Sequence, residues 1–143
     1  MKFVSKNLAE TADIAQKFLA ECAPKEGVAM IVGLSGDLGS GKTAFTQAVA
    51  KHLGIEENVT SPTFIIEKVY KLKGSQFEYL IHIDAYRLEG GHELQHLGWS
   101  EITNNSKNLI FLEWPEKVID ILPDAMKMIT FKFIDENTRE IEF

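Results

Sequence analysis

The chain has 143 residues, 45% of them hydrophobic and 25% charged, which is typical of a globular protein with a core of its own. The net charge of −6 and the presence of only two arginines, Arg87 and Arg139, argue against a protein that binds nucleic acid through a basic face. The sequence shows no membrane-length apolar run, no signal-peptide layout and a single cysteine, which excludes a disulfide framework. We therefore expect one cytoplasmic domain over residues 1–143, with no membrane contact.

The first expected element is a short edge strand at Phe3 and Val4, followed by a helix. Ser5 or Asn7 can cap this helix, which we expect to run to about Cys22 and to end before the Pro-Lys-Glu-Gly segment at 24–27. Apolar residues at helical spacing predict its buried face, which consists of Leu8, Ala12, Ala15, Phe18, Leu19 and Cys22.

The most informative segment is a strand, a glycine-rich loop and a helix in direct succession. Residues 28–34 form an apolar run typical of a buried parallel strand, and residues 43–53 carry apolar side chains at helical spacing. The loop between them matches G-x-x-x-x-G-K-[ST], in which backbone N–H groups surround a phosphate, the lysine reaches the β- and γ-phosphates and the hydroxyl holds Mg²⁺. We predict a nucleotide site formed by Gly36, Asp37, Leu38, Gly39, Ser40, Gly41, Lys42, Thr43 and Ala44.

The rest of the chain alternates between short strands and helices. We expect strands over 64–72 and 77–84 joined by a turn at 73–76, a short helix over 90–98, a strand over 108–112, a helix over 115–122, and a terminal hairpin of strands 126–134 and 139–143. This alternation around a phosphate loop predicts a P-loop NTPase-like three-layer α/β domain. Its sheet is expected to be mixed and partly parallel, with antiparallel hairpins.

Two acids stand at the ends of predicted strands, Asp84 after residues 77–83 and Glu113 after residues 108–112. In phosphate-loop proteins an acid at such a position holds Mg²⁺ beside the loop hydroxyl, so Asp84 is the first candidate metal-binding acid. Glu113 is a candidate for binding the metal or for polarising the attacking water. Both acids are expected at the carboxyl edge of the sheet, where ligands of open α/β sheets bind.

A polar segment, Thr60-Ser61-Pro62-Thr63, lies between the loop helix and the second strand. Proteins with a phosphate loop often place a switch segment there, whose hydroxyl binds Mg²⁺ when the γ-phosphate is present and releases it after hydrolysis. Composition alone is equally compatible with a polar turn.

A rival pattern, H-E-x-x-H, is formed by His92, Glu93 and His96 and resembles the zinc-binding helix of metalloproteases. The chain holds only two other histidines, His52 and His82, and neither is placed to supply the third ligand that a catalytic zinc needs. We therefore do not expect a zinc site.

The identity of the nucleotide can be inferred in part from motifs that the sequence lacks. No Asn/Thr-Lys-x-Asp segment for reading guanine is present, which favours ATP over GTP. Kinases that clamp a second phosphorylated substrate need several arginines. This chain has only two, which argues against that class of kinase.

The assembled motifs resemble the TsaE family, formerly called YjeE. They are Gly-Asp-Leu-Gly-x-Gly-Lys-Thr at 36–43, Ser-Pro-Thr-Phe at 61–64, His-x-Asp-x-Tyr-Arg-Leu at 82–88, Glu-Leu-x-x-Leu-Gly at 93–98 and Glu-Trp-Pro-Glu at 113–116. The resemblance implies a Mg²⁺-dependent ATPase of bacterial tRNA threonylcarbamoyladenosine synthesis. Such proteins act with TsaD and TsaB, reach tRNA only through that complex, and support its turnover rather than transfer the threonylcarbamoyl group.

The resemblance also implies roles for individual residues. The catalytic set is Lys42 for phosphate, Asp84 for metal, Glu113 for water or metal and Thr63 for the switch, with Thr43 as a further metal ligand, Glu10 and Thr11 near the adenine, and Trp114 in nucleotide or partner contact. Hydrolysis by the chain alone is expected to be slow, since apart from Arg87 no arginine is evident as a finger, a group worth about 10³–10⁵ in rate. A small-molecule kinase and a nucleotide-gated binding module remain as alternatives.

Overall fold

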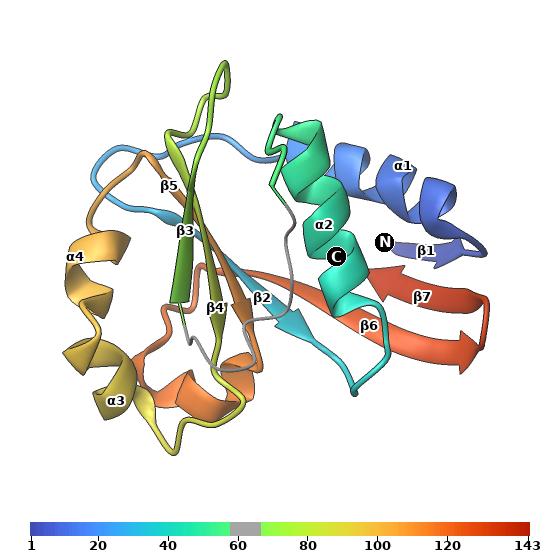
Figure 1. The fold of residues 1–143 in the computed structure, drawn as a ribbon. Coiled ribbons are helices and arrows are strands. Elements are labelled where there is room, and N and C mark those ends of the chain that lie inside the picture. Colours follow the sequence, from blue (N-terminus) through green and yellow to red (C-terminus); the bar gives the residue numbers. More distant parts are fainter. Residues whose placement is uncertain (58–66) are drawn as a thin grey trace.

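The computed structural model describes residues 1–57 and 67–143, in which seven strands form one mixed sheet. In chain order the strands are β1 (Lys2–Ser5), β2 (Met30–Ser35), β3 (Glu67–Lys71), β4 (Tyr79–Asp84), β5 (Asn108–Glu113), β6 (Lys127–Asp135) and β7 (Thr138–Glu142). Their spatial order is β1-β7-β6-β2-β5-β4-β3, with β6, β2, β5 and β4 parallel to one another and the pairs toward both edges antiparallel (Figure 1). The expected mixed, partly parallel sheet is confirmed.

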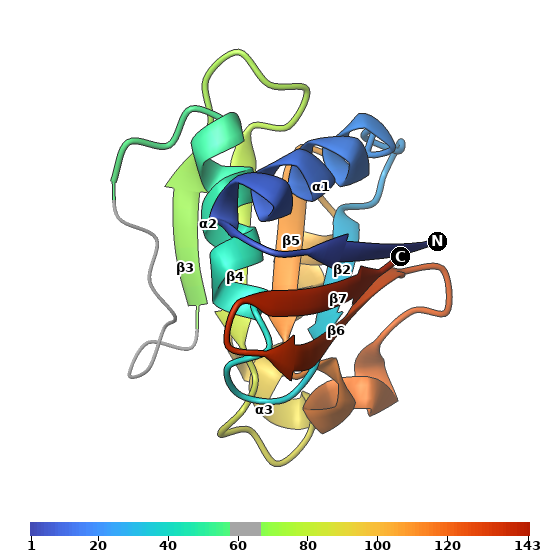
Figure 2. The same cartoon turned by 90° about the vertical axis from the view of Figure 1, so that its right-hand side faces the viewer.

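Helices cover both faces of the sheet and give the molecule three layers. The helices α1 (Leu8–Ala20) and α2 (Lys42–His52) lie over one face (Figure 2), while α3 (Gly91–His96), α4 (Trp99–Thr103) and the 3₁₀ helix η1 (Pro115–Ile121) cover the other. Strand β5 shows why both faces are covered. Leu109 and Phe111 belong to the core under α1 and α2, Ile110 and Leu112 belong to the opposite core, and all four are fully buried.

The start of α1 is explained by its cap. Asn7 Oδ1 accepts a hydrogen bond from Glu10 N at 2.8 Å, and Glu10 Oε1 accepts one from Lys6 N at 2.9 Å. The first bond satisfies a backbone N–H group that the helix start would otherwise leave without a partner, and the second ties the residue before the cap to the first turn. Asn7 is thus the cap, one of the two residues predicted.

The buried face of α1 differs from the expected one at its first turn. Ala15, Phe18 and Cys22 are buried as predicted, but Leu8 is 75% exposed, so its expected burial is wrong. The buried stripe begins only at Thr11, because the first turn lies at the rim of a cavity rather than over the sheet.

The segment after Gly98 contains a helix that periodicity did not reveal. The predicted helix near Gly90 ends as α3 at His96, and Gly98, with φ of 89°, then begins the five-residue α4. A helix of little more than one turn is too short to show a repeating apolar pattern. None of the helices in the described residues is long and apolar enough to cross a bilayer.

The terminal hairpin lies within the main sheet. Strand β6 pairs in parallel with β2, with Gly33 opposite Met128, and β7 then pairs with β1 at the edge. A Cβ at Gly33 would stand 2.5 Å from Met128 Sδ and 3.2 Å from Pro115 Cγ, so a larger residue there would require the flexible Met128 side chain to move. The pairing brings the β6–β7 turn beside the loop that follows β2.

Candidate functional site

The loop between β2 and α2, residues 36–41, is built from glycines in left-handed or extended conformations. Gly36, Gly39 and Gly41 have φ of 157°, 77° and 105°. A Cβ at Gly36 would stand 2.6 Å from Phe131 O and 2.7 Å from Ser40 Oγ, which excludes any other residue there. Gly41 caps α2 without a side-chain hydrogen bond, so the first N–H groups of the helix have no acceptor at the cap. Such a helix start is suited to an anion.

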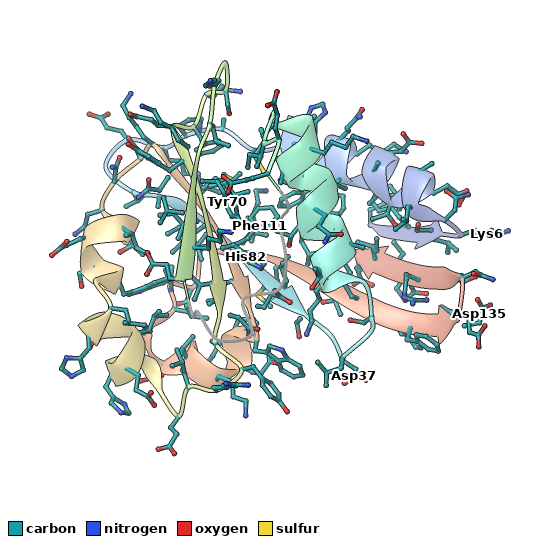
Figure 3. The ribbon with its side chains drawn as sticks, in the orientation of Figure 1. Lys6, Asp37, Tyr70, His82, Phe111 and Asp135 are labelled. Atoms are coloured by element: carbon teal, nitrogen blue, oxygen red, sulfur yellow. The ribbon has the colours of Figure 1, made fainter. Side chains whose placement is uncertain are left out.

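Ser40 adds an independent sign that a ligand belongs in this loop. Its side chain is fully buried, yet Ser40 Oγ has no hydrogen-bond partner in the described part of the chain. A buried hydroxyl without a partner costs stability unless a ligand or water completes it. Phosphate oxygens accept hydrogen bonds, so the loop fits a phosphate. Leu38 lies at the exposed tip of the loop next to Asp37, which marks the place in Figure 3.

Lys42, the first residue of α2, turns its amine back onto the loop. It is 5% exposed, its Nζ donates to Gly36 O at 2.5 Å, and Nζ lies 3.8 Å from the centroid of the Trp114 ring. Burial lowers the pKa of Lys42, and the negative charges of Glu113, Glu116 and other nearby carboxylates partly oppose this. An ammonium held by one carbonyl and one indole ring can exchange both for phosphate oxygens.

Asp84 and Glu113 end neighbouring parallel strands and lie directly opposite each other in the register of β4 and β5. Adjacent strands are about 4.8 Å apart, and the alternation along both strands places the two side chains on the face covered by α2. Asp84 Oδ1 accepts from Tyr86 N at 3.0 Å, and burial raises the pKa of Asp84 above its ordinary value. The structure thus brings both predicted acids to the carboxyl edge where the loop begins.

Trp114 follows Glu113 in an unusual backbone conformation. Its φ and ψ of 59° and 52° are left-handed, and it is the only residue other than glycine with positive φ among residues 1–57 and 67–143. A bulky residue in this region costs about 1–3 kcal/mol and usually marks a functional position. The conformation places the indole ring against the amine of Lys42. The centroid of the Tyr86 ring lies 5.0 Å from the centroid of the Trp114 ring.

A cavity of about 470 Å³ opens beside the start of α2. Asn7 and Thr11 of the α1 segment line it from one side, Gly41 and Ala44 from α2, and Asn137 from the β6–β7 turn. Thr11 Oγ1 also shares a 2.6 Å hydrogen bond with Ser5 Oγ. The cavity adjoins the phosphate-suited loop, and its size suits a nucleoside.

Known proteins are similar to this chain along most of its length. The model of the family "Threonylcarbamoyl adenosine biosynthesis protein TsaE" matches residues 5–141. The chain belongs to the TsaE family. A TsaE protein of Rickettsia typhi is 35% identical over 91% of this chain and 85% of its own length, and that of Borreliella burgdorferi is 39% identical over 75% and 76%. The crystal structure of YdiB from Bacillus subtilis matches 99% of this chain and 82% of its own with a TM-score of 0.76 at 30% identity.

Two residues predicted for the site of this TsaE protein, Glu10 and Thr43, have a less direct relation to the cavity and the loop. Glu10 does not line the cavity, because its carboxylate is used to cap α1. Thr43 stands half-buried in the first turn of α2, next to Lys42. Thr63 and the rest of the predicted switch lie outside the described residues, so the switch stays a prediction.

The two histidines of the H-E-x-x-H pattern are exposed, and the expectation that they bind no zinc stays a prediction. His92 and His96 lie on the surface, and Glu93 Oε1 accepts a hydrogen bond from Glu89 N at 2.9 Å. No cluster of three or more His, Cys, Asp or Glu suited to a metal occurs within residues 1–57 and 67–143. A Mg²⁺ held by one or two carboxylates and by substrate phosphates does not need such a cluster.

Arg139 of β7 is a site residue that the sequence reasoning missed. Its Nε donates to Gly39 O at 3.1 Å, its Nη1 donates to Thr138 O at 3.1 Å, and its guanidinium lies 4.6 Å from the centroid of Phe133. The terminal hairpin therefore supports the glycine loop from the side. Only the rarity of arginine in this chain pointed to it.

Proposed function

We propose that this TsaE protein binds Mg·ATP and hydrolyses it to ADP and phosphate in the formation of tRNA threonylcarbamoyladenosine, acting with TsaD and TsaB. The supporting observation is the meeting of three features at one edge of the sheet. These are a glycine loop with an unpartnered buried hydroxyl, the buried amine of Lys42, and the paired acids Asp84 and Glu113. The family's name supports the pathway.

In this proposal the glycine loop binds the phosphates of the nucleotide, and the adjacent cavity binds its nucleoside. The phosphates bind the N–H groups of the glycine loop and the start of α2, and Lys42 exchanges Gly36 O for phosphate oxygens. The nucleoside occupies the cavity lined by Thr11 and Ala44. The missing guanine-reading motif favours ATP.

Thr43, Asp84 and Glu113 are the residues that would hold Mg²⁺, which supplies positive charge to the phosphates. Glu113 can also orient and polarise the attacking water, since it is a buried carboxylate at the edge of the site. Arg139 already donates to backbone carbonyls, so it is not placed as an arginine finger. We therefore propose that hydrolysis is slow in the isolated chain and that the TsaD–TsaB complex, which alone contacts the tRNA, stimulates it.

The test is phosphate release from Mg·ATP by the purified chain, with and without TsaD and TsaB, beside Lys42→Ala and Glu113→Ala variants. Release that rises with the partners and is lost in both variants supports the proposal. Tight ATP binding without release would instead support a nucleotide-gated binding module. Transfer of phosphate to an added small-molecule acceptor would support a kinase.

A further inference from the structure

His82 is a buried polar residue to which the site described so far gives no role. It lies in β4, two residues before Asp84 and on the same face of the sheet (Figure 3). Its Nε2 is 2.7 Å from Glu113 Oε2, and the two side chains are 0% and 4% exposed. Because His82 is in register with Phe111, Glu113 stands diagonally across from it, one pleat nearer the site.

Within residues 1–57 and 67–143, the hydrogen bond to Glu113 is the one that this imidazole makes. A carboxylate oxygen can only accept, so Nε2 carries the proton and donates. The other ring nitrogen, Nδ1, is buried and has no partner in the described part of the chain. The surroundings are otherwise a hydrophobic core that includes Tyr70, Leu80 and Phe111, where an apolar side chain would avoid the cost of an unpartnered nitrogen.

We propose that His82 is a positioning residue for Glu113. Its Nε2–H holds Oε2, which stops the carboxylate from rotating and leaves Oε1 for the water or the metal. The inference rests on the proposed function, because the orientation of Glu113 matters only if Glu113 acts in the site. Loss of a partner that orients a ligating or catalytic group typically costs about 10–100-fold in activity or metal affinity.

If His82 only stabilised the fold, its replacements would change stability rather than catalysis. Two amide replacements of similar polarity distinguish this structural role from the positioning role. The amide nitrogen of glutamine can reach the position of Nε2, whereas that of asparagine reaches only the position of Nδ1. We therefore compare His82→Gln with His82→Asn for unfolding temperature, KM for ATP, partner-stimulated kcat, and the gain in ATP affinity that Mg²⁺ produces. Asn108→Leu is the matched control, because it removes another buried hydrogen bond, Asn108 Nδ2 to Ile102 O, at the far end of β5.

We expect His82→Asn to lower kcat about 10–100-fold and to change KM by less than about threefold. His82→Gln should keep kcat within about threefold of the wild type. Both variants should unfold at similar temperatures. Asn108→Leu should lower the unfolding temperature and leave kcat unchanged. In the chain without nucleotide, imidazole ¹⁵N spectra should show His82 protonated at Nε2 only. Equal kcat in the two His82 variants, or a proton on Nδ1 alone, would overturn the inference with the proposed function intact. A wild-type chain that releases no phosphate even with TsaD and TsaB would overturn both.

Discussion

The two faces of the sheet are equally well buried but differ in what they bury. Under α1 and α2, polar groups such as Lys42, His82 and Glu113 lie among packed aromatic rings, and Ser40, Tyr70 and His82 each keep an atom without a hydrogen-bond partner in the described residues. Among the described residues, the core under α3, α4 and η1 is apolar apart from Asn108, whose amide donates to Ile102 O at 2.9 Å.

The difference between the two faces shows which part of the molecule contains the groups that lower its stability. Among the described residues, the unpartnered hydroxyl of Ser40, an ammonium that is costly to bury and the left-handed Trp114 gather around the glycine loop, while the unpartnered atoms of His82 and Tyr70 lie in the core under α1 and α2. Proteins usually keep such local violations only at functional sites. The opposite face follows the ordinary rules of packing and serves to hold the sheet.

The largest effect is expected from Lys42→Ala. The variant should lower partner-stimulated phosphate release by about 10²–10³-fold, because the amine is the charged donor nearest the loop. Its unfolding temperature without nucleotide should not fall, since burial already lowers the pKa of Lys42 and so makes the charged form costly in the folded state at neutral pH. Lys51→Ala, an exposed lysine of the same helix, is the control. A clear drop in stability for Lys42→Ala alone would mean that the lysine is mainly structural.

The opposite face should show the reverse behaviour. Leu94 of α3 is fully buried there, so Leu94→Ala should reduce the free energy of unfolding by about 2–5 kcal/mol in urea titrations. Its affinity for ATP, measured by calorimetry where the variant is fully folded, should stay within about twofold of the wild type. If ATP affinity fell in proportion to stability, the separation of the two faces would be broken.

A smaller effect is expected at the support of the glycine loop. Arg139→Ala removes the hydrogen bond to Gly39 O, a contact worth about 1 kcal/mol net, so ATP affinity should fall about fivefold. Lys132→Ala, an exposed lysine of β6, should leave the affinity unchanged. Equal affinities for the two variants would show that the hairpin does not hold the loop in its binding conformation.

The smallest effect is spectroscopic, and it separates Trp114, whose ring contacts Lys42 although it also packs against the opposite core, from Trp99. Trp114 covers Lys42, while Trp99 is 5% exposed in the opposite core. Addition of Mg·ADP should change the fluorescence of the wild type and of Trp99→Phe, but not that of Trp114→Phe. A nucleotide-dependent change that persists in Trp114→Phe would show that the response does not arise at the ring beside Lys42.

Much of the site could be predicted from local sequence because its chemistry depends on short spacings. The loop of residues 36–43 follows a buried strand and starts a helix, and Asp84 and Glu113 are the last residues of apolar strands. Parallel strands bring their carboxyl ends together, so these residues had to meet once the sheet formed. The cap at Asn7 is equally local.

Other features depended on partners far away in the chain. Arg139 contacts Gly39 across 100 residues, and His82 contacts Glu113 across 31, through pairings that no periodicity encodes. The exposure of Leu8 likewise depends on where α1 lies against the sheet. The sequence by itself determined the α/β class, the glycine loop and the strand-end acids, because hydrophobic period and turn chemistry are local. Only the tertiary structure decided which hairpin supports the loop and which histidine holds the glutamate, because strand order and register arise from packing of the whole sheet.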